Sequence, residues 1–99
     1  MKILVTGFES YNENVITRIE QMEQLMEEVV KVLENCPESI KEDEVVKQKI
    51  SVLEDYQRSG QWLSDFECDE RGELPIELKR GILSEDLLYN LLCDTKVWL

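Results

Sequence analysis

The sequence predicts an all-α protein in which a long antiparallel helical hairpin packs with two shorter C-terminal helices. Three observations predict this fold. Apolar residues recur at alternating steps of four and three along the first long segment. Helix-stop residues follow at Pro37 and Gly60. Hydrophobic residues make up 42% of the 99 residues, which is typical of a folded chain. We expect a single helical domain over residues 13–99.

The first helix is predicted over residues 14–36. Its apolar residues follow a heptad pattern, and others widen the stripe beyond a dimer seam, so we expect it to contact two neighbours. The heptad positions are Val15, Ile19, Met22, Met26, Val29, Leu33 and Cys36. Ser10 with Glu13 forms a candidate capping box for its start, and Pro37 ends it.

The second helix is predicted over residues 39–59. Ser39 and Glu42 have the spacing of a capping box, and Gly60 stands where a glycine commonly follows a helix. The connection between the two helices is short, so they should form an antiparallel hairpin. The expected buried face and its flanks are Val46, Ile50, Leu53, Val45, Val52 and Tyr56.

Two shorter helices are predicted after this hairpin. One runs from Pro75 to Lys79, because proline suits the first turn of a helix, and Gly81 ends it. The last helix begins after Ser84, a favourable N-cap residue. Residues 1–12 differ from the rest and predict a short N-terminal β-strand or a flexible segment.

Composition excludes several classes of function. The chain has 22 acidic and 11 basic residues, no histidine and a formal net charge of −11. Without histidine, the usual catalytic triads and histidine-ligated zinc or haem sites are excluded. Nucleic acid and anionic membranes repel a negative chain, so we expect neither as a direct partner. We expect no cofactor, no bound metal and no enzymatic activity.

The cysteines favour a reducing compartment. Cys36, Cys68 and Cys93 are odd in number and include no close pair, which argues against a disulfide framework. No signal peptide or long apolar run is evident, so we expect a cytoplasmic protein. Cys36 and Cys93 fall on apolar helical stripes, and we expect them to pack in the core.

Two groups of acidic residues are the candidate partner-binding residues, together with Trp98. The first group, called the acidic stretch below, consists of Asp65, Glu67, Asp69, Glu70 and Glu73. The second, called the glutamate stripe, consists of Glu20, Glu27 and Glu34 at seven-residue spacing on the first helix.

Three interpretations of the acidic stretch stay open. It is a loop paired with Lys79 and Arg80, a partner-binding surface, or a site for calcium or magnesium. The EF-hand pattern fails because its required glycine falls on Glu70. Among the aromatic residues, Trp62 and Phe66 are expected in the core. Trp98 lies next to the last residue and is a candidate for docking on a partner or on a second copy.

The second half of the chain resembles a family of small bacterial proteins. The pattern G-x-W-L-x-D occupies residues 60–65, D-E-x-G-x-L-P occupies 69–75, and L-K-R-G-x-L-S-E-D occupies 78–86. These pieces resemble the bacterial domain of unknown function 4298, and residues 1–12 lie outside its pattern. The resemblance implies a small, mostly helical cytoplasmic protein and brings no assigned activity.

From these features we expect a small acidic, non-enzymatic module that binds another protein with a basic surface, with a homodimer as a further candidate. The alternative is an acidic inhibitor that mimics DNA or RNA and binds a host nuclease or another nucleic-acid-binding protein. The first helix and Glu13 just before it carry six glutamates. Duplex DNA would place roughly 20 charges along the same length of about 35 Å, so one helix copies it poorly.

Overall fold

The computed structural model describes residues 13–99, and within this range the fold is all-α without a strand, as predicted. Its elements are α2 (Glu13–Asn35), α3 (Ser39–Glu42), α4 (Glu44–Arg58), α5 (Gln61–Glu70), the 3-10 helix η1 (Gly81–Leu83) and α6 (Glu85–Lys96). The predicted N-terminal strand of residues 1–12 and the capping box at Ser10 lie outside the described residues.

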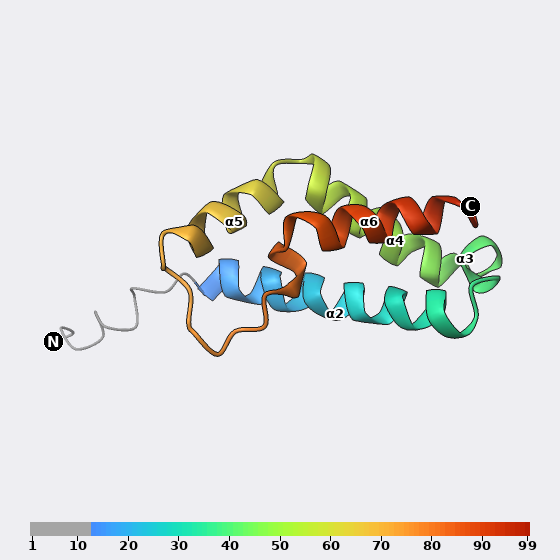
Figure 1. Cartoon of the computed structure of the whole chain (residues 1–99), viewed down its shortest axis with the longest axis horizontal. Helices are drawn as coiled ribbons and strands as arrows, with labels where there is room; N and C mark the ends of the chain where they lie inside the picture. Colours follow the sequence, from blue (N-terminus) through green and yellow to red (C-terminus); the bar gives the residue numbers. More distant parts are fainter. Residues whose placement is uncertain (1–12) are drawn as a thin grey trace, which may run out of the picture.

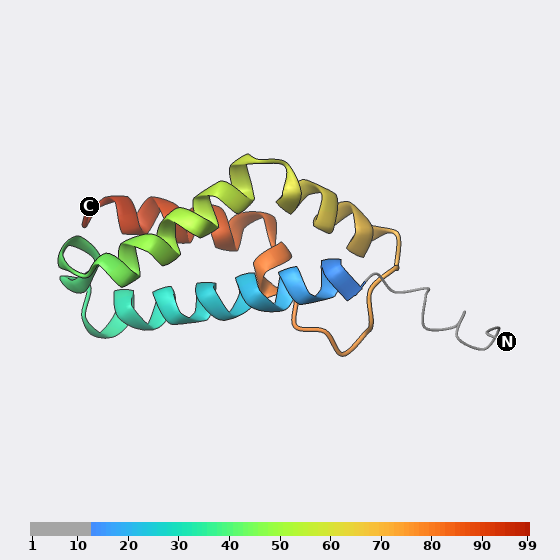
Figure 2. The same cartoon turned by 180° about the vertical axis from the view of Figure 1, so that it is seen from behind.

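Helices α2 and α4 form the predicted antiparallel hairpin, and α6 packs beside both of them while running parallel to α2 (Figure 1). After α4 the chain bends at Gly60, whose φ of 93° places it in the left-handed region, and continues as α5 (Figure 2). Glycine adopts this conformation without the steric cost of a Cβ. The glycine at the end of the second helix was therefore predicted correctly.

The core is apolar and draws on every described element. Its side chains come from all five described α-helices, from η1 and from the segment between α5 and η1. Each apolar side chain buried in full contributes about 1.5–3 kcal/mol. Those with at most 1% exposure are Ile19, Val29, Ile40, Leu53, Ile82 and Leu88. Helix α2 contacts α4 on one side and η1 with α6 on the other, which confirms the prediction of two neighbours.

The predicted second helix is divided in two. Asp43 has extended backbone (φ −94°, ψ 114°), and its Oδ1 accepts a hydrogen bond from the Val45 amide at 2.9 Å. Aspartate caps a helix better than it continues one, so α3 ends and α4 begins here. The predicted capping box at Ser39 is wrong, because Ser39 lies within α3 and its hydroxyl is 3.3 Å from the Cys36 sulfur.

Of the two short C-terminal helices, the last lies where it was predicted and the first does not. The first is α5, over part of the acidic stretch, because Asp65 and Cys68 point inward at helical spacing. The predicted helix from Pro75 to Lys79 is absent, and those residues form turns. The second is α6, which follows Ser84 as predicted, although no side-chain hydrogen bond from Ser84 caps it.

Candidate functional site

Asp65 of the acidic stretch is fully buried, so its assignment to a partner-binding surface was wrong. Its Oδ1 accepts Arg18 Nη2 at 2.5 Å, and its Oδ2 accepts Arg18 Nε at 2.9 Å and the Tyr56 hydroxyl at 2.8 Å. A buried carboxylate needs such partners, because an unpaired charge is costly to desolvate. Asp65 therefore joins α2, α4 and α5.

The rest of the acidic stretch is divided between internal pairs and exposed positions. Asp69 pairs with Arg80, and Glu73 Oε2 lies 2.9 Å from Arg71 Nε. The interpretation as a salt-bridged loop is therefore correct for Arg80. Lys79 pairs instead with Glu27 of α2, at 3.2 Å.

Glu67 and Glu70 are exposed on α5. Within residues 13–99, no group of three or more histidine, cysteine, aspartate or glutamate residues is placed to hold a metal ion.

The burial of the cysteines differs from the prediction made from the apolar stripes of the helices. Cys36 and Cys93 are exposed and Cys68 is buried, so the expected core packing of the first two is wrong. The Cys68 sulfur donates to Glu73 Oε1 at 3.4 Å. Burial raises the pKa of the Cys68 thiol, and the bond to Glu73 raises it further. Arg71 and then Cys68 hold the pKa of Glu73 below its usual value.

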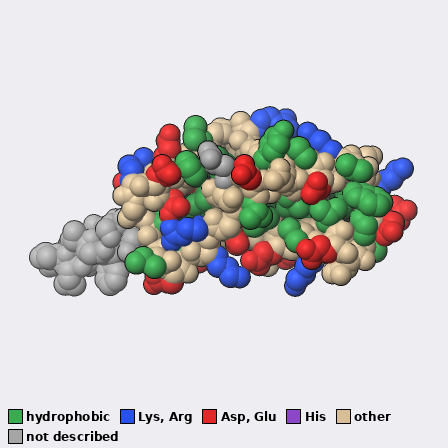
Figure 3. All heavy atoms as spheres, in the orientation of Figure 1, with side chains coloured by type: hydrophobic (Ala, Val, Ile, Leu, Met, Phe, Trp, Pro, Cys, Tyr) green, Lys and Arg blue, Asp and Glu red, His purple; other side chains and the backbone are tan. Residues whose placement is uncertain are grey.

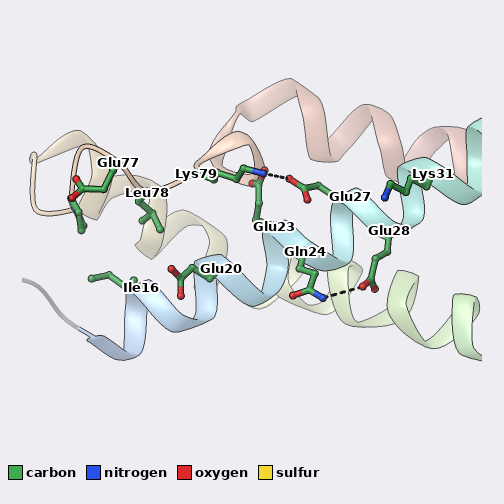
Figure 4. Close-up of a pocket in the computed structure, with 11 residues that line it drawn as sticks. Ile16, Glu20, Glu23, Gln24, Glu27, Glu28, Lys31, Glu77, Leu78 and Lys79 are labelled. Carbon is green, nitrogen blue, oxygen red and sulfur yellow. Dashed lines mark hydrogen bonds and ion pairs between the residues drawn. The ribbon is translucent and has the colours of Figure 1, made fainter.

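A cavity lies between α2 and residues 75–79, and we call it the α2 pocket. Its volume is about 730 Å³, a size typical of binding sites. Ile16, Pro75 and Leu78 are its apolar lining residues. Figure 4 shows Ile16 and Leu78 toward one end of the pocket, and Gln24, Glu28 and Lys31 toward the other. The apolar residues of the pocket therefore lie at one end, beside Glu20 and Glu77, and the other end is polar.

The α2 pocket is acidic. Five glutamates line it, against the two lysines Lys31 and Lys79. The glutamates are Glu20, Glu23, Glu27, Glu28 and Glu77. Two members of the glutamate stripe, Glu20 and Glu27, thus face the pocket, and Glu34 does not line it.

Only part of this charge is neutralised by neighbours. Glu28 Oε1 lies 2.9 Å from Lys49 Nζ on α4, and Gln24 donates to Glu28 Oε2 at 3.1 Å. The bond from Lys49 and then that from Gln24 lower the pKa of Glu28. Figure 3 shows acidic and basic side chains next to one another along the edge of the molecule where α2 lies.

Glu23 fixes the inner wall of the α2 pocket and was not among the predicted site residues. Its side chain is buried, and its Oε1 accepts the backbone N–H of Ile82 at 2.7 Å. A Cβ on Gly81 would lie 3.2 Å from Glu23 Oε2, so only glycine fits there without displacing the carboxylate. Its position between Ile19 and Met26, on the apolar face of the helix, could have identified Glu23 as a buried glutamate from the sequence.

Arg80 organises the other wall. Its guanidinium donates to the carbonyl of Pro75, to those of Ile76 and Leu78 at 3.3 Å each, and to Asp69. These bonds hold the backbone of the turn, while the Ile76 side chain is 93% exposed. Residues 75–79, called the loop below, thus have an ordered backbone that presents the apolar side chain of Ile76 to solvent.

The two tryptophans differ. Trp62 is half-buried, packs against the core and donates to the Ile82 carbonyl at 2.8 Å. Phe66 stacks on Trp62 with ring centroids 5.0 Å apart but is not one of the core residues, so its expected place in the core is wrong. Trp98 is 38% exposed, between the exposed Val97 and Leu99. Nothing in the described residues covers this apolar end of the chain completely.

Comparison with known proteins gives one match. The family model described as "Domain of unknown function (DUF4298)" matches residues 19–99, as the sequence patterns suggested. No curated protein and no solved structure matches the chain. None of the helices within residues 13–99 has the length and apolar character needed to cross a bilayer.

Several residues of the sequence patterns that resemble the family fix the backbone around α5 and the turns that follow it. Asp65, Asp69 and Arg80 are paired internally, Gly72 has a left-handed φ of 72°, and Gly81 contacts Glu23. None of these positions lines the α2 pocket itself, and the exposed carboxylates of the pocket come mainly from α2.

Proposed function

Since the chain belongs to the DUF4298 family, described only as a domain of unknown function, we propose its function from the geometry of the α2 pocket. The protein is a small non-enzymatic interaction module, and it binds a basic segment of another protein in this pocket. The observation that carries the proposal is the lining of five glutamates and two lysines around an apolar end. Complementary charge steers a cationic partner to such a surface and fixes its orientation.

The internal ion pair of the pocket supports this proposal. Lys79 and Glu27 side chains are 75% and 47% exposed. An ion pair that exposed contributes about 0–1 kcal/mol. A lysine or arginine of the partner therefore replaces Lys79 at Glu27 with little loss, and further contacts to Glu20 and Glu77 are then gained.

The non-enzymatic part of the proposal rests on chemistry. The chain has no histidine to act as a base. The buried thiol of Cys68 has a raised pKa, which disfavours the reactive thiolate. Cysteine usage supports a cytoplasmic location as part of the same proposal.

A pair of matched charge reversals tests the pocket. The variant Glu20→Lys/Glu77→Lys changes the pocket, whereas Glu67→Lys/Glu70→Lys makes the same change of charge on α5. All four side chains are exposed, so both variants should fold, which circular dichroism checks. In affinity capture with mass spectrometry, the pocket variant should lose a partner that the α5 variant retains. Loss from the α5 variant alone would move the site to α5.

The acidic nucleic-acid mimic is the second hypothesis, and competition separates it from the first. Mimicry needs an unbroken line of charge, and Lys79 and Lys49 pair with Glu27 and Glu28 along α2, which favours the interaction module. A captured partner that releases its DNA or RNA when this protein is added, with steep dependence on salt, would support mimicry instead.

A further inference from the structure

We propose that the segment bound in the α2 pocket is basic over most of its length and ends in a bulky apolar side chain, which docks against Ile76. This inference rests on the proposed function, since it gives the chemistry of the occupant of the same pocket. Three observations support it: the ordered backbone of the loop, the exposed side chain of Ile76 and the uneven distribution of apolar residues in the pocket.

Ile76 is the most exposed large hydrophobic side chain among residues 13–99. Ile76 is not itself a lining residue, but it stands between Pro75 and Glu77, which both line the pocket, so its backbone lies beside the pocket. A single exposed isoleucine is not unusual on a protein surface. What distinguishes Ile76 is that Arg80 holds the carbonyl groups of Pro75, Ile76 and Leu78 at the same time.

Such a loop is preorganised for binding. A partner that covers Ile76 does not have to order the backbone of the turn first, because Arg80 has already ordered it. An apolar side chain presented on an ordered backbone is the usual form of an interaction anchor.

The asymmetry of the pocket orients the occupant. Ile16 and Leu78 lie toward one end, and the polar side chains of Gln24, Glu28 and Lys31 lie toward the other (Figure 4). The apolar end of the occupant therefore meets Leu78 and the neighbouring Ile76, and its basic residues follow α2 past Glu20 and Glu27.

The length of the occupant follows from α2. Ile16 and Lys31 mark the limits of the pocket along the helix and are separated by about 22 Å at the rise of an α-helix. An extended chain covers this distance with about seven residues.

Synthetic peptides of about seven residues test the inference. The first has lysines and serines with a leucine pair at one end, and the second replaces that leucine pair with serine. Fluorescence anisotropy at low ionic strength measures the dissociation constants. The leucine peptide should bind about tenfold more tightly to the wild type. Ile76→Ser should remove this advantage and leave the affinity for the serine peptide unchanged.

Val97→Ser is the matched control, because Val97 is 81% exposed but lies at the C-terminal end of α6, whereas Ile76 stands between two residues that line the pocket. It should leave both affinities unchanged. Arg80→Lys retains the charge but not the planar fork, and it should weaken the leucine peptide selectively if Arg80 positions the loop.

The outcomes separate the two proposals. If both peptides bind equally and Ile76→Ser changes neither affinity, the role of Ile76 is wrong, while the proposal that the acidic α2 pocket binds a basic segment stands. If neither peptide binds, or the double variant Glu20→Lys/Glu77→Lys binds both as the wild type does, the pocket proposal fails and this inference fails with it.

Discussion

Arg18 of α2 and Asp65 of α5 are 47 residues apart in the sequence and form a two-point ion pair in the fold. Asp65 is fully buried, whereas the Arg18 side chain is 26% exposed. Tyr56 of α4 binds the same carboxylate. One acidic side chain thus connects α2, α4 and α5.

Removing Asp65 should destabilise the protein strongly. In Asp65→Ala, Arg18 and Tyr56 lose their common partner, and we expect the free energy of unfolding to fall by about 3 kcal/mol. Urea denaturation followed by circular dichroism measures it. The double variant Arg18→Met/Asp65→Leu should recover much of the loss, since apolar residues often replace a buried pair without cost. A single variant as stable as the wild type would contradict the structural role of the pair.

Tyr56 should make the stability fall in alkali. Burial, and then the hydrogen bond to Asp65, raises the pKa of Tyr56 far above its usual value of 10.0. In the unfolded chain this phenol loses its proton near pH 10, while the folded state retains it, so stability is lost as the pH rises above about 10. Urea denaturation between about pH 9 and pH 11 should show this decline. In Tyr56→Phe the free energy of unfolding should decline less steeply with pH than in the wild type. Equal slopes in the two proteins would contradict this role of Tyr56.

The three thiols should differ in reactivity. Cys36 and Cys93 are exposed, whereas Cys68 is buried and its pKa is raised by burial and by Glu73. We expect a disulfide reagent to modify Cys68 at least about tenfold more slowly than the other two, because the thiolate is the reacting form. Mass spectrometry of digested samples assigns the rates. Glu73→Gln should speed the reaction of Cys68, and three equal rates would be inconsistent with its burial.

Gly81→Ala should cost stability through Glu23. The added methyl group would lie 3.2 Å from Glu23 Oε2 and 3.5 Å from the Met26 methyl group, against a carboxylate already fixed by Ile82. We expect a loss of about 1–2 kcal/mol in thermal or urea denaturation. In a Glu23→Ala background, the same change should cost less, because the close contact is gone. Strict additivity of the two substitutions would show that this contact carries no energy.

A homodimer would form through the C-terminal apolar residues. Val97, Trp98 and Leu99 are exposed. The net charge of −11 opposes association of two copies, so salt should increase the dimer fraction by screening this repulsion. Sedimentation equilibrium at low and high salt measures it. Trp98→Ser should reduce association and Leu63→Ser on α5 should not. A monomer at every salt concentration would exclude the dimer.

The hairpin was predictable because its signals are local. The heptad pattern places the first helix within one residue of α2 at each end, and Gly60 ends the second helix as expected. The break at Asp43 was not predicted, because an aspartate can either continue a helix or cap a new one. Here the hydrogen bond from the Val45 amide to the Asp43 side chain favours the cap. The turns after Pro75 depend on Arg80, whose bonds to Pro75 and Ile76 no local pattern shows.

The candidate site was predictable only in part. Heptad spacing identifies Glu20 and Glu27 as one face of a helix, and both line the α2 pocket. Counting carboxylates in sequence cannot distinguish Asp65, which is buried, from Glu67, which is exposed. That difference depends on Arg18, which approaches from 47 residues away.

The bond between Glu23 and Ile82 has a consequence during synthesis on the ribosome. The two residues are separated by 59 positions. At about 5–20 residues per second, the glutamate is made about 3–12 s before its partner. The nascent hairpin therefore emerges with a hydrated carboxylate on its inner face, which opposes burial of that face against other nascent chains. Only when Gly81 and Ile82 emerge can the last helix settle and the chain complete its fold.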